Sequence, residues 1–189
     1  SKSFLNSLIS KKILTTYDVS LFEQNLNTIT KIMMNDLNNF KKSRMDKKKF
    51  YKKYGHLRPG TYDISSKRYD QIKNLNFKIE NIKKSRNIYT ILNKKKNKIK
   101  KILKKHNFEN ISYSDLIDYI SSAICQREYS KFIFTKYLSL ILEIIAKYGL
   151  NLGLSRVQLS HLDIKYFLNK KFLNKKKFLL NKSLENLRT

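Results

Sequence analysis

Turn-forming residues are scarce in this chain. Only four glycines and one proline occur among its 189 residues. A β-sandwich or β-barrel joins many short strands by tight turns, and those turns depend largely on glycine and proline. Hydrophobic residues make up 41% of the chain, which is enough to form a buried core. The sequence therefore predicts an all-α fold, a bundle of long helices.

The N-terminal half contains two segments whose apolar residues recur at helical spacing. One segment covers 20–40, and Ser20 with Glu23 gives a capping-box pattern at its start. A shorter helix is expected over 46–54. Gly55 follows it, where a left-handed C-cap is common.

The clearest helical pattern covers residues 112–149. Ser112 and Asp115 resemble a capping box at its start, and Gly149 is expected to end it. A continuous helix of this length would measure on the order of 50 Å. We expect partner helices to cover its long apolar stripe.

The C-terminal part predicts shorter elements. Two short helices are expected to begin near Ser155 and Asp163, and 170–189 is a lysine-rich amphipathic stretch. We expect one helical domain over 1–169, followed by a helical tail or a connection to a missing downstream domain. The chain begins without methionine, so we expect an internal piece of a longer protein.

One segment departs from the helical pattern. Residues 55–70 contain the only proline and two of the four glycines, and Pro59-Gly60 predicts a type II turn. We therefore expect one structured irregular loop within the helical domain. Its structure-forming residues are expected to be Gly55, Pro59, Gly60, Asp63, Arg68 and Asp70.

The charged residues of this loop allow three interpretations. Arg58 and Arg68 could pair with Asp63 and Asp70 and make the loop rigid. The same arginines could form an anion or phosphate pocket with His56, because guanidinium groups match phosphate oxygens. In the third interpretation, some of these residues anchor the loop and others face a ligand.

A second group of cations lies in the predicted long helix. Arg127 and Lys131 are four residues apart, so they share a helix face. Arg127 interrupts the apolar stripe, and a cation that faces a packed surface needs a carboxylate or a phosphate opposite it. We predict that Arg127 pairs with an acidic residue of the 55–70 loop. A phosphate is the alternative partner.

The chain carries a formal charge of +27, from 41 Lys and Arg against 14 Asp and Glu. Such a charge is typical of proteins that bind nucleic acid. Most of the excess is lysine, however, and it occurs with abundant asparagine and isoleucine, which indicates an AT-rich coding bias. A basic nucleic-acid-binding module that uses the lysines of 94–105 is therefore our alternative interpretation.

The sequence lacks the residue patterns that several other classes of function require. Cys125 is the only cysteine, so no intrachain disulfide forms, and no spacing typical of a zinc site, P-loop or nucleophile elbow occurs. No apolar run is long enough to cross a membrane. We expect a cytoplasmic chain without a metal site, and we expect His161 to be a surface or lightly packed histidine.

Two stretches resemble a known family. "YGHLRPGTYDI", followed by "RYD", is similar to a signature of the phosphoenolpyruvate-utilising enzymes, which include phosphoenolpyruvate synthase, pyruvate phosphate dikinase and rifampicin phosphotransferase. Residues 127–168 also resemble members of this family. Those members usually carry an acidic residue after the serine–arginine pair, where this chain has Val157 and Gln158. The likeness covers roughly 15–168.

The resemblance implies an internal helical segment of an ATP-dependent phosphotransferase. In that family an ATP-grasp domain phosphorylates a histidine on a mobile domain, which passes the phosphoryl group to an acceptor. Neither the ATP-grasp elements nor the Thr-Ser-His motif occurs here. ATP and Mg²⁺ would thus belong to the parent enzyme, and the flanking domains would be the partners. The candidates to face the phosphoryl donor or acceptor are His56, Arg58, Arg127 and Lys131, and we expect no catalytic residue.

Overall fold

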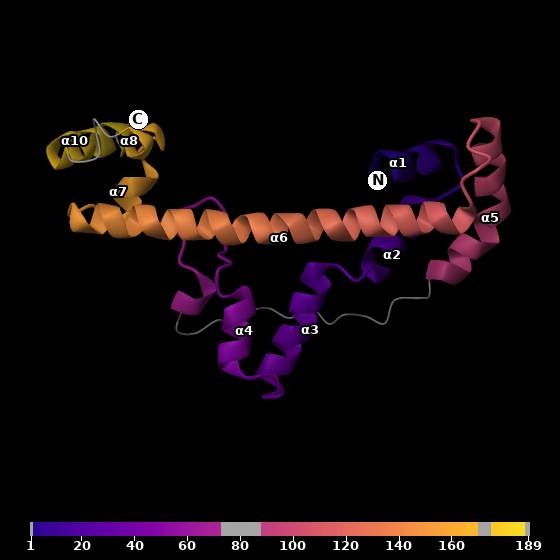
Figure 1. Cartoon of the computed structure of the whole chain (residues 1–189), viewed down its shortest axis with the longest axis horizontal. Coiled ribbons are helices and arrows are strands. Elements are labelled where there is room, and N and C mark those ends of the chain that lie inside the picture. The colour runs from indigo at the N-terminus through magenta and orange to yellow at the C-terminus, as the bar shows by residue number, and fades with distance from the viewer. Residues whose placement is uncertain (1, 73–87, 170–174, 188–189) are drawn as a thin grey trace. The chain divides into compact units, whose positions relative to one another are not determined.

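The computed structural model describes residues 2–72, 88–169 and 175–187. These residues form helices, turns and irregular segments, and they contain no β-strand. The predicted all-α fold is confirmed. Figure 1 follows the helices in chain order. They are α1 (Lys2–Ser10), α2 (Thr16–Asn25), α3 (Ile29–Lys41), α4 (Lys47–Tyr54), α5 (Ile88–Lys105), α6 (Tyr113–Asn151), α7 (Arg156–Ser160), α8 (Lys165–Leu168) and α10 (Lys176–Leu187), with a 3₁₀ turn at Tyr69–Gln71.

The chain divides into two compact units, each built from two separate stretches of sequence. Unit 1 combines Ser1–Asn35 with Lys78–Lys131, and unit 2 combines Asp36–Phe77 with Phe132–Thr189. The first half of α6 thus belongs to unit 1 and the second half to unit 2. This division differs from the expected single domain over 1–169.

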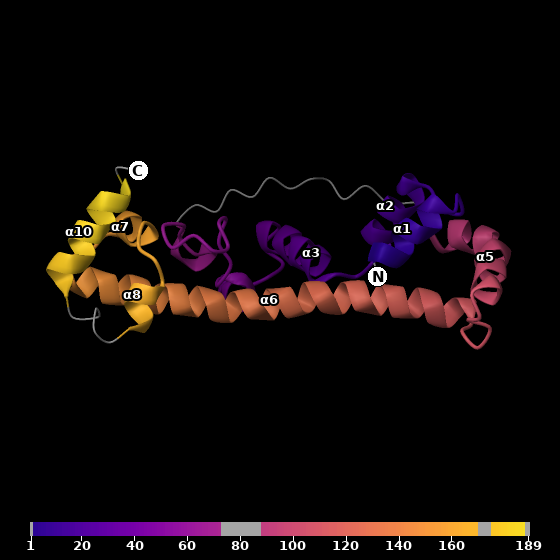
Figure 2. The same ribbon diagram turned by 90° about the horizontal axis from the view of Figure 1, so that it is seen from above.

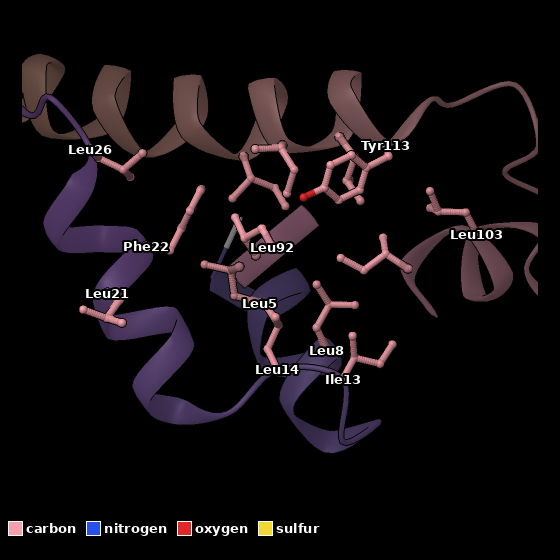
Figure 3. Packing of buried hydrophobic residues seen from close by; sticks show 14 residues of the cluster. Leu5, Leu8, Ile13, Leu14, Leu21, Phe22, Leu26, Leu92, Leu103 and Tyr113 are labelled. Carbon is pink, nitrogen blue, oxygen red and sulfur yellow. The ribbon is translucent and has the colours of Figure 1, made fainter. Parts of the chain in front are cut away.

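Unit 1 has a continuous apolar core formed by α1, α2, α5 and the first turns of α6. Figure 3 shows Leu5, Phe22 and Leu92 directed toward this common interior. The buried residues are Leu5, Leu8, Ile13, Leu14, Leu21, Phe22, Leu26, Leu92, Ile99, Leu103, Tyr113, Leu116, Ile117 and Ile120. In α5 the residues at 92, 99 and 103 have helical spacing, so one side of this lysine-rich helix is buried.

The predicted helix over 20–40 is two helices. The capping box is formed by Thr15 and Asp18 rather than Ser20 and Glu23, so α2 begins earlier than expected. The helical path ends at Leu26, which adopts an extended conformation and is buried in the core of unit 1. Periodicity alone does not reveal this break, because apolar residues continue on both sides of it.

Asp18 has a second role in unit 1. Lys95 of α5 donates a hydrogen bond of 2.6 Å to the same carboxylate that caps α2. Burial acts to raise the pKa of Asp18, but the hydrogen bonds from Lys95 and Thr15 outweigh it and lower this pKa. One of the lysines of the 94–105 run is therefore engaged within the protein.

The N-terminal part of unit 2 contains an aromatic cluster. The rings of Phe40 and Phe50 stack with their centroids 5.0 Å apart, and Phe50 also contacts Tyr54. Tyr54 is fully buried and packs edge-on against Phe132 of α6. The short helix α4 is thereby fixed to the second half of α6. Asp46 caps α4 by accepting a hydrogen bond from the backbone of Lys49.

The C-terminal part of unit 2 has its own apolar core, in which α10 takes part. Leu179 of α10 is fully buried with Leu154 and Leu159. Ser183 also donates a hydrogen bond of 2.8 Å to the carbonyl of Gln158. The described part of 170–189 is therefore an integral element of unit 2 rather than a tail, because its apolar side completes this core.

The ends of α6 follow local sequence signals only in part. Ser112 and Asp115 form the predicted capping box. The helix continues past Gly149 to Asn151, and the left-handed residue is Gly153, with φ of 74°. Gly149 is instead required by packing, since a Cβ there would lie 2.5 Å from a methyl carbon of Leu159.

The buried hydroxyl of Tyr54 provides a test of this packing. It donates a hydrogen bond of 2.6 Å to Asp36, and burial together with this bond raises the pKa of Tyr54 to about 12. We predict that Tyr54→Phe lowers the free energy of unfolding by about 1 kcal/mol, the usual net value of one hydrogen bond. Urea denaturation followed by circular dichroism measures this difference. Tyr62→Phe, at an exposed tyrosine, is the control, and equal stability of the two variants would contradict the assignment.

Candidate functional site

The irregular loop of unit 2 is closed on itself by backbone hydrogen bonds. The amide of Tyr69 donates to the carbonyl of Leu57 at 2.8 Å, and the amide of Asp70 donates to the carbonyl of Gly55 at 3.3 Å. The two ends of the loop therefore lie side by side. In Figure 2 this loop lies along the second half of α6, near α7.

Two expectations about the loop glycines are wrong. Gly55 has φ of −60°, so it is not a left-handed cap. Gly60 does not have a positive φ, so Pro59-Gly60 is not a type II turn. Both glycines are needed for space, because a Cβ on Gly55 would lie 2.9 Å from the Asp70 carboxylate and one on Gly60 would lie 2.8 Å from the Cβ of Asp63.

Arg58 anchors the loop from inside. Its side chain is 1% exposed. One terminal nitrogen, Nη1, donates to the carbonyls of Asp63 and Ser66. The other, Nη2, donates to the Ser139 hydroxyl at 2.9 Å and to Glu143 at 3.1 Å, both on α6. Arg58 is therefore a loop-anchoring residue, and its terminal nitrogens face internal acceptors rather than a ligand.

Glu143 is the centre of this network. Its Oε1 accepts from Arg58, and its Oε2 accepts from Arg156 at 2.8 Å and from Gln71 at 2.9 Å. Arg156, the first residue of α7, also donates to the carbonyl of Ile64 at 3.0 Å. One carboxylate thus connects the loop, α6 and α7.

The network keeps Glu143 ionised. Burial acts to raise its pKa, but the hydrogen bonds from Arg156 and Gln71 and the charges of Arg156 and Arg58 outweigh burial and lower the pKa of Glu143 to about 2. A carboxylate held in this way has its lone pairs occupied, so we assign it a structural role rather than that of a general acid or base.

The acidic residues of the loop act locally. Asp63 accepts hydrogen bonds from the backbone amide and hydroxyl of Ser65, and Asp70 pairs with Arg68. The Arg58–Asp63 contact goes through the backbone carbonyl of Asp63 and not through its carboxylate. The loop is therefore held by several short-range contacts and by long-range hydrogen bonds to Ser139, Glu143 and Arg156.

Arg127 does not pair as predicted. It is 63% exposed, and its ion pair within the described residues is a 3.9 Å contact with its neighbour Glu128. Lys131 is also exposed. Both residues lie in unit 1, whereas His56 and Arg58 lie in unit 2. The ion pair between α6 and the loop is the reverse of the predicted one. Here α6 supplies the acid, Glu143, and the loop supplies the arginine, Arg58.

His56 is buried and incompletely bonded. Its ring packs edge-on against Phe132, with centroids 4.8 Å apart, and its Nε2 atom has no hydrogen-bond partner in the described part of the chain. Burial lowers the pKa of His56, and the charges of Lys136 and Arg68 lower it further. The Nε atom of Arg68 is likewise buried without a partner. This side of the loop therefore combines the positive charge of Arg68 and Lys136 with two buried nitrogens that have no hydrogen-bond partner in the described part of the chain.

A cavity of about 270 Å³ lies on another side of the loop, within unit 2. Its apolar lining comes from α6, α7 and the segment after α7, including Leu142, Ile145 and Leu162. The polar groups at its edge are Tyr62 and Asp63 of the loop, together with Ser160. The arrangement suits a small molecule with an apolar body and a hydrogen-bonding group.

No group of three or more His, Cys, Asp or Glu in the described residues is arranged to hold a metal ion. Among the same residues, no helix combines the length and the apolar character needed to cross a bilayer. No protein-family model matches the chain, and comparisons with curated proteins and with solved structures give no match either. The resemblance to phosphoenolpyruvate-utilising enzymes therefore rests on the two motifs alone.

Sequence reasoning missed Glu143, Arg156 and Gln71, although the sequence contains a signal for the first of them. Glu143 is the only acidic residue between positions 129 and 162, and it lies within the apolar run "LSLILEIIA". A single carboxylate in such a run requires a cationic partner when the helix is buried. The identity of that partner is a property of the tertiary structure.

The low pKa of Glu143 predicts acid sensitivity. An unfolded glutamate has a pKa near 4.3, so the contribution of Glu143 is complete above about pH 5 and is lost as the pH falls toward 2. We predict that the free energy of unfolding decreases by roughly 2–3 kcal/mol over this range through this group. Glu143→Gln should be less stable than the wild type at pH 7, and its free energy of unfolding should decrease less as the pH falls. Parallel pH profiles for the two proteins would contradict the assignment.

The lowered pKa of His56 predicts a separate loss of stability, at a pH nearer to neutral. Its folded pKa lies below the unfolded value of about 6.5, so it contributes stability that is present above that pH and is lost as the pH falls below it. The wild type should therefore have a lower denaturation midpoint at pH 5.5 than at pH 7.5, and His56→Gln should reduce this difference. His106→Gln, at an exposed histidine, is the control. If the denaturation midpoint of His56→Gln falls as much between pH 7.5 and pH 5.5 as that of the wild type, another group is responsible for the decrease.

Proposed function

We propose that this chain is an internal helical domain of a phosphoenolpyruvate-synthase-like, ATP-dependent phosphotransferase, and that it positions an acceptor or the phosphohistidine domain. One observation carries the proposal. Arg58 belongs to the first family-like stretch, and Glu143 and Arg156 belong to the second. These residues form one buried network within unit 2. Motifs that are far apart in sequence but joined in structure are expected if they serve one site.

In this proposal the loop is a rigid platform. Phosphoryl transfer depends mainly on positioning and on stabilising negative charge. The Glu143 network supplies the positioning. Arg68 and Lys136 lie close enough to His56 for their charges to lower its pKa, and these two cations would give a phosphoryl group that approaches His56 a favourable electrostatic environment. ATP and Mg²⁺ would be held by the flanking domains of the parent enzyme.

The 270 Å³ cavity is the proposed acceptor site. Its volume is slightly below the usual range for small-molecule pockets, about 300–1,000 Å³, so the acceptor would be small. Asp63 or Ser160 could accept a hydrogen bond from an acceptor hydroxyl or amine, while Leu142 and Ile145 contact its apolar part. The chain alone should not hydrolyse ATP.

The reading frame on both sides of this segment tests the proposal directly. We predict an ATP-grasp domain upstream and a mobile domain with a Thr-Ser-His motif downstream. In the complete protein, Leu142→Trp should fill the cavity and prevent acceptor phosphorylation while histidine phosphorylation by ATP continues. A reading frame that contains neither domain would contradict the proposal.

A specific observation supports a second candidate, a nucleic-acid-binding module. The exposed side of α5 presents seven lysines, at 94, 96, 98, 100, 101, 104 and 105. Binding of a single-stranded oligonucleotide through this face should weaken steeply with salt. Neutralising these lysines to glutamine should reduce the salt dependence, whereas binding that is unchanged by the substitutions would count against this candidate.

A further inference from the structure

The second half of α6 has an exposed apolar seam. Phe134, Tyr137, Ile141 and Ile144 are each 51–62% exposed. Their spacing of three, four and three residues places them on one side of the helix. Leu140, also half exposed, lies beside them. We call these five residues the α6 seam.

The opposite side of the same helix is occupied by the protein itself. Thr135, Ser139, Glu143 and Ala146 are buried, and their spacing of four, four and three residues defines a second face. With 3.6 residues per turn, this buried face points away from the seam. The contacts that fix the loop and α7 to α6 therefore leave the seam free to bind a partner.

The spacing of the seam favours a helix as that partner. Phe134, Tyr137, Ile141 and Ile144 occupy the a and d positions of two successive heptads, the narrow pattern by which helices pair in coiled coils. A helix that lies on a bilayer normally has a wide apolar face and a solvated polar face. In α6 the side opposite the seam is buried in the protein rather than solvated, so α6 lacks the polar face of a bilayer-bound helix.

The charges around the seam define the chemistry of the partner. Lys131 and Lys147 are each three residues from a seam residue, and Lys136 is four residues from Leu140. All three lysines are exposed, while Glu143, the only acid between 129 and 162, is buried. A second copy would bring the same lysines together, with a charge of +27 on each chain. An acidic helix would neutralise them.

We infer that the α6 seam is a docking surface for an acidic amphipathic helix of a partner protein. This inference does not rest on the proposed function, because it uses the exposure, spacing and charge of α6 alone. The apolar side of the partner helix packs on Tyr137 and Ile141, and its flanking carboxylates lie opposite Lys131, Lys136 and Lys147.

The probe is a designed peptide of about four heptads, with isoleucine at a, leucine at d and glutamate at e and g. Its comparison peptide has lysine at e and g. Fluorescence anisotropy with the full 189-residue chain measures both affinities. The glutamate peptide should bind at least about tenfold more tightly than the lysine peptide, and the difference should shrink at high salt.

Two variants of α6 form a matched pair. Ile141→Glu changes the centre of the seam and should weaken binding of the glutamate peptide about tenfold or more. Leu150→Glu introduces the same charge at another exposed apolar residue, outside the seam, and should change affinity less than twofold. Circular dichroism should give equal helix content for both. Tyr137→Gln is a second seam variant with the same expected direction.

A charge-reversed variant tests the electrostatic part. Lys136→Glu combined with Lys147→Glu should shift the preference toward the lysine peptide. Equal binding of the two peptides, absence of binding, or equal effects of Ile141→Glu and Leu150→Glu would overturn the proposal. So would a dimer in light scattering that Ile141→Glu converts to a monomer. Flotation with phosphatidylcholine–phosphatidylserine vesicles that Ile141→Glu abolishes would assign the seam to a lipid surface instead.

Discussion

The arrangement of unit 2 depends on the buried carboxylate of Glu143. This group has two arginines and one glutamine as partners, and each comes from a different part of the chain. Ionised groups lose hydration when they are buried, so such a site persists only when its hydrogen bonds are nearly complete. Here Arg58 and Gln71 approach from the two ends of the loop and Arg156 approaches from α7. The same interaction that satisfies one acid thus determines where the loop and α7 lie on α6.

A network of this kind provides specificity more than stability. Apolar residues of similar volume could stabilise the same contact equally well, but they would not select one orientation of the loop. The loop has little regular hydrogen bonding beyond the two backbone contacts that close it and the local turns stabilised by Asp63. Its path therefore depends on directional interactions with Arg58. The Arg58 contacts therefore give the loop one orientation on α6.

Local sequence signals predicted only part of the local structure, since the signals at Ser20, Gly55 and Gly149 did not hold. The caps at Ser112 and Ser155 form as expected, because both partners lie within four residues of each other. Long-range partners were not predictable. Arg127 was expected to approach the loop because it interrupts an apolar stripe, yet it is exposed, and Arg58 is the residue that meets an acid on α6. Both arginines were expected to pair with an acid, and only tertiary packing decides which of them is buried. The break at Leu26 escaped prediction for a related reason, since its extended conformation is stabilised by a core built from distant segments.

The fully buried Leu179 gives the C-terminal helix a consequence for the order in which the protein can fold. The core formed by Leu154 and Leu159 lacks one side until α10 is added. During synthesis this part of unit 2 therefore remains incomplete until α10 has left the ribosome, and its apolar side chains stay accessible to chaperones in that interval. Unit 1 has no such requirement, because its core is complete with the first turns of α6.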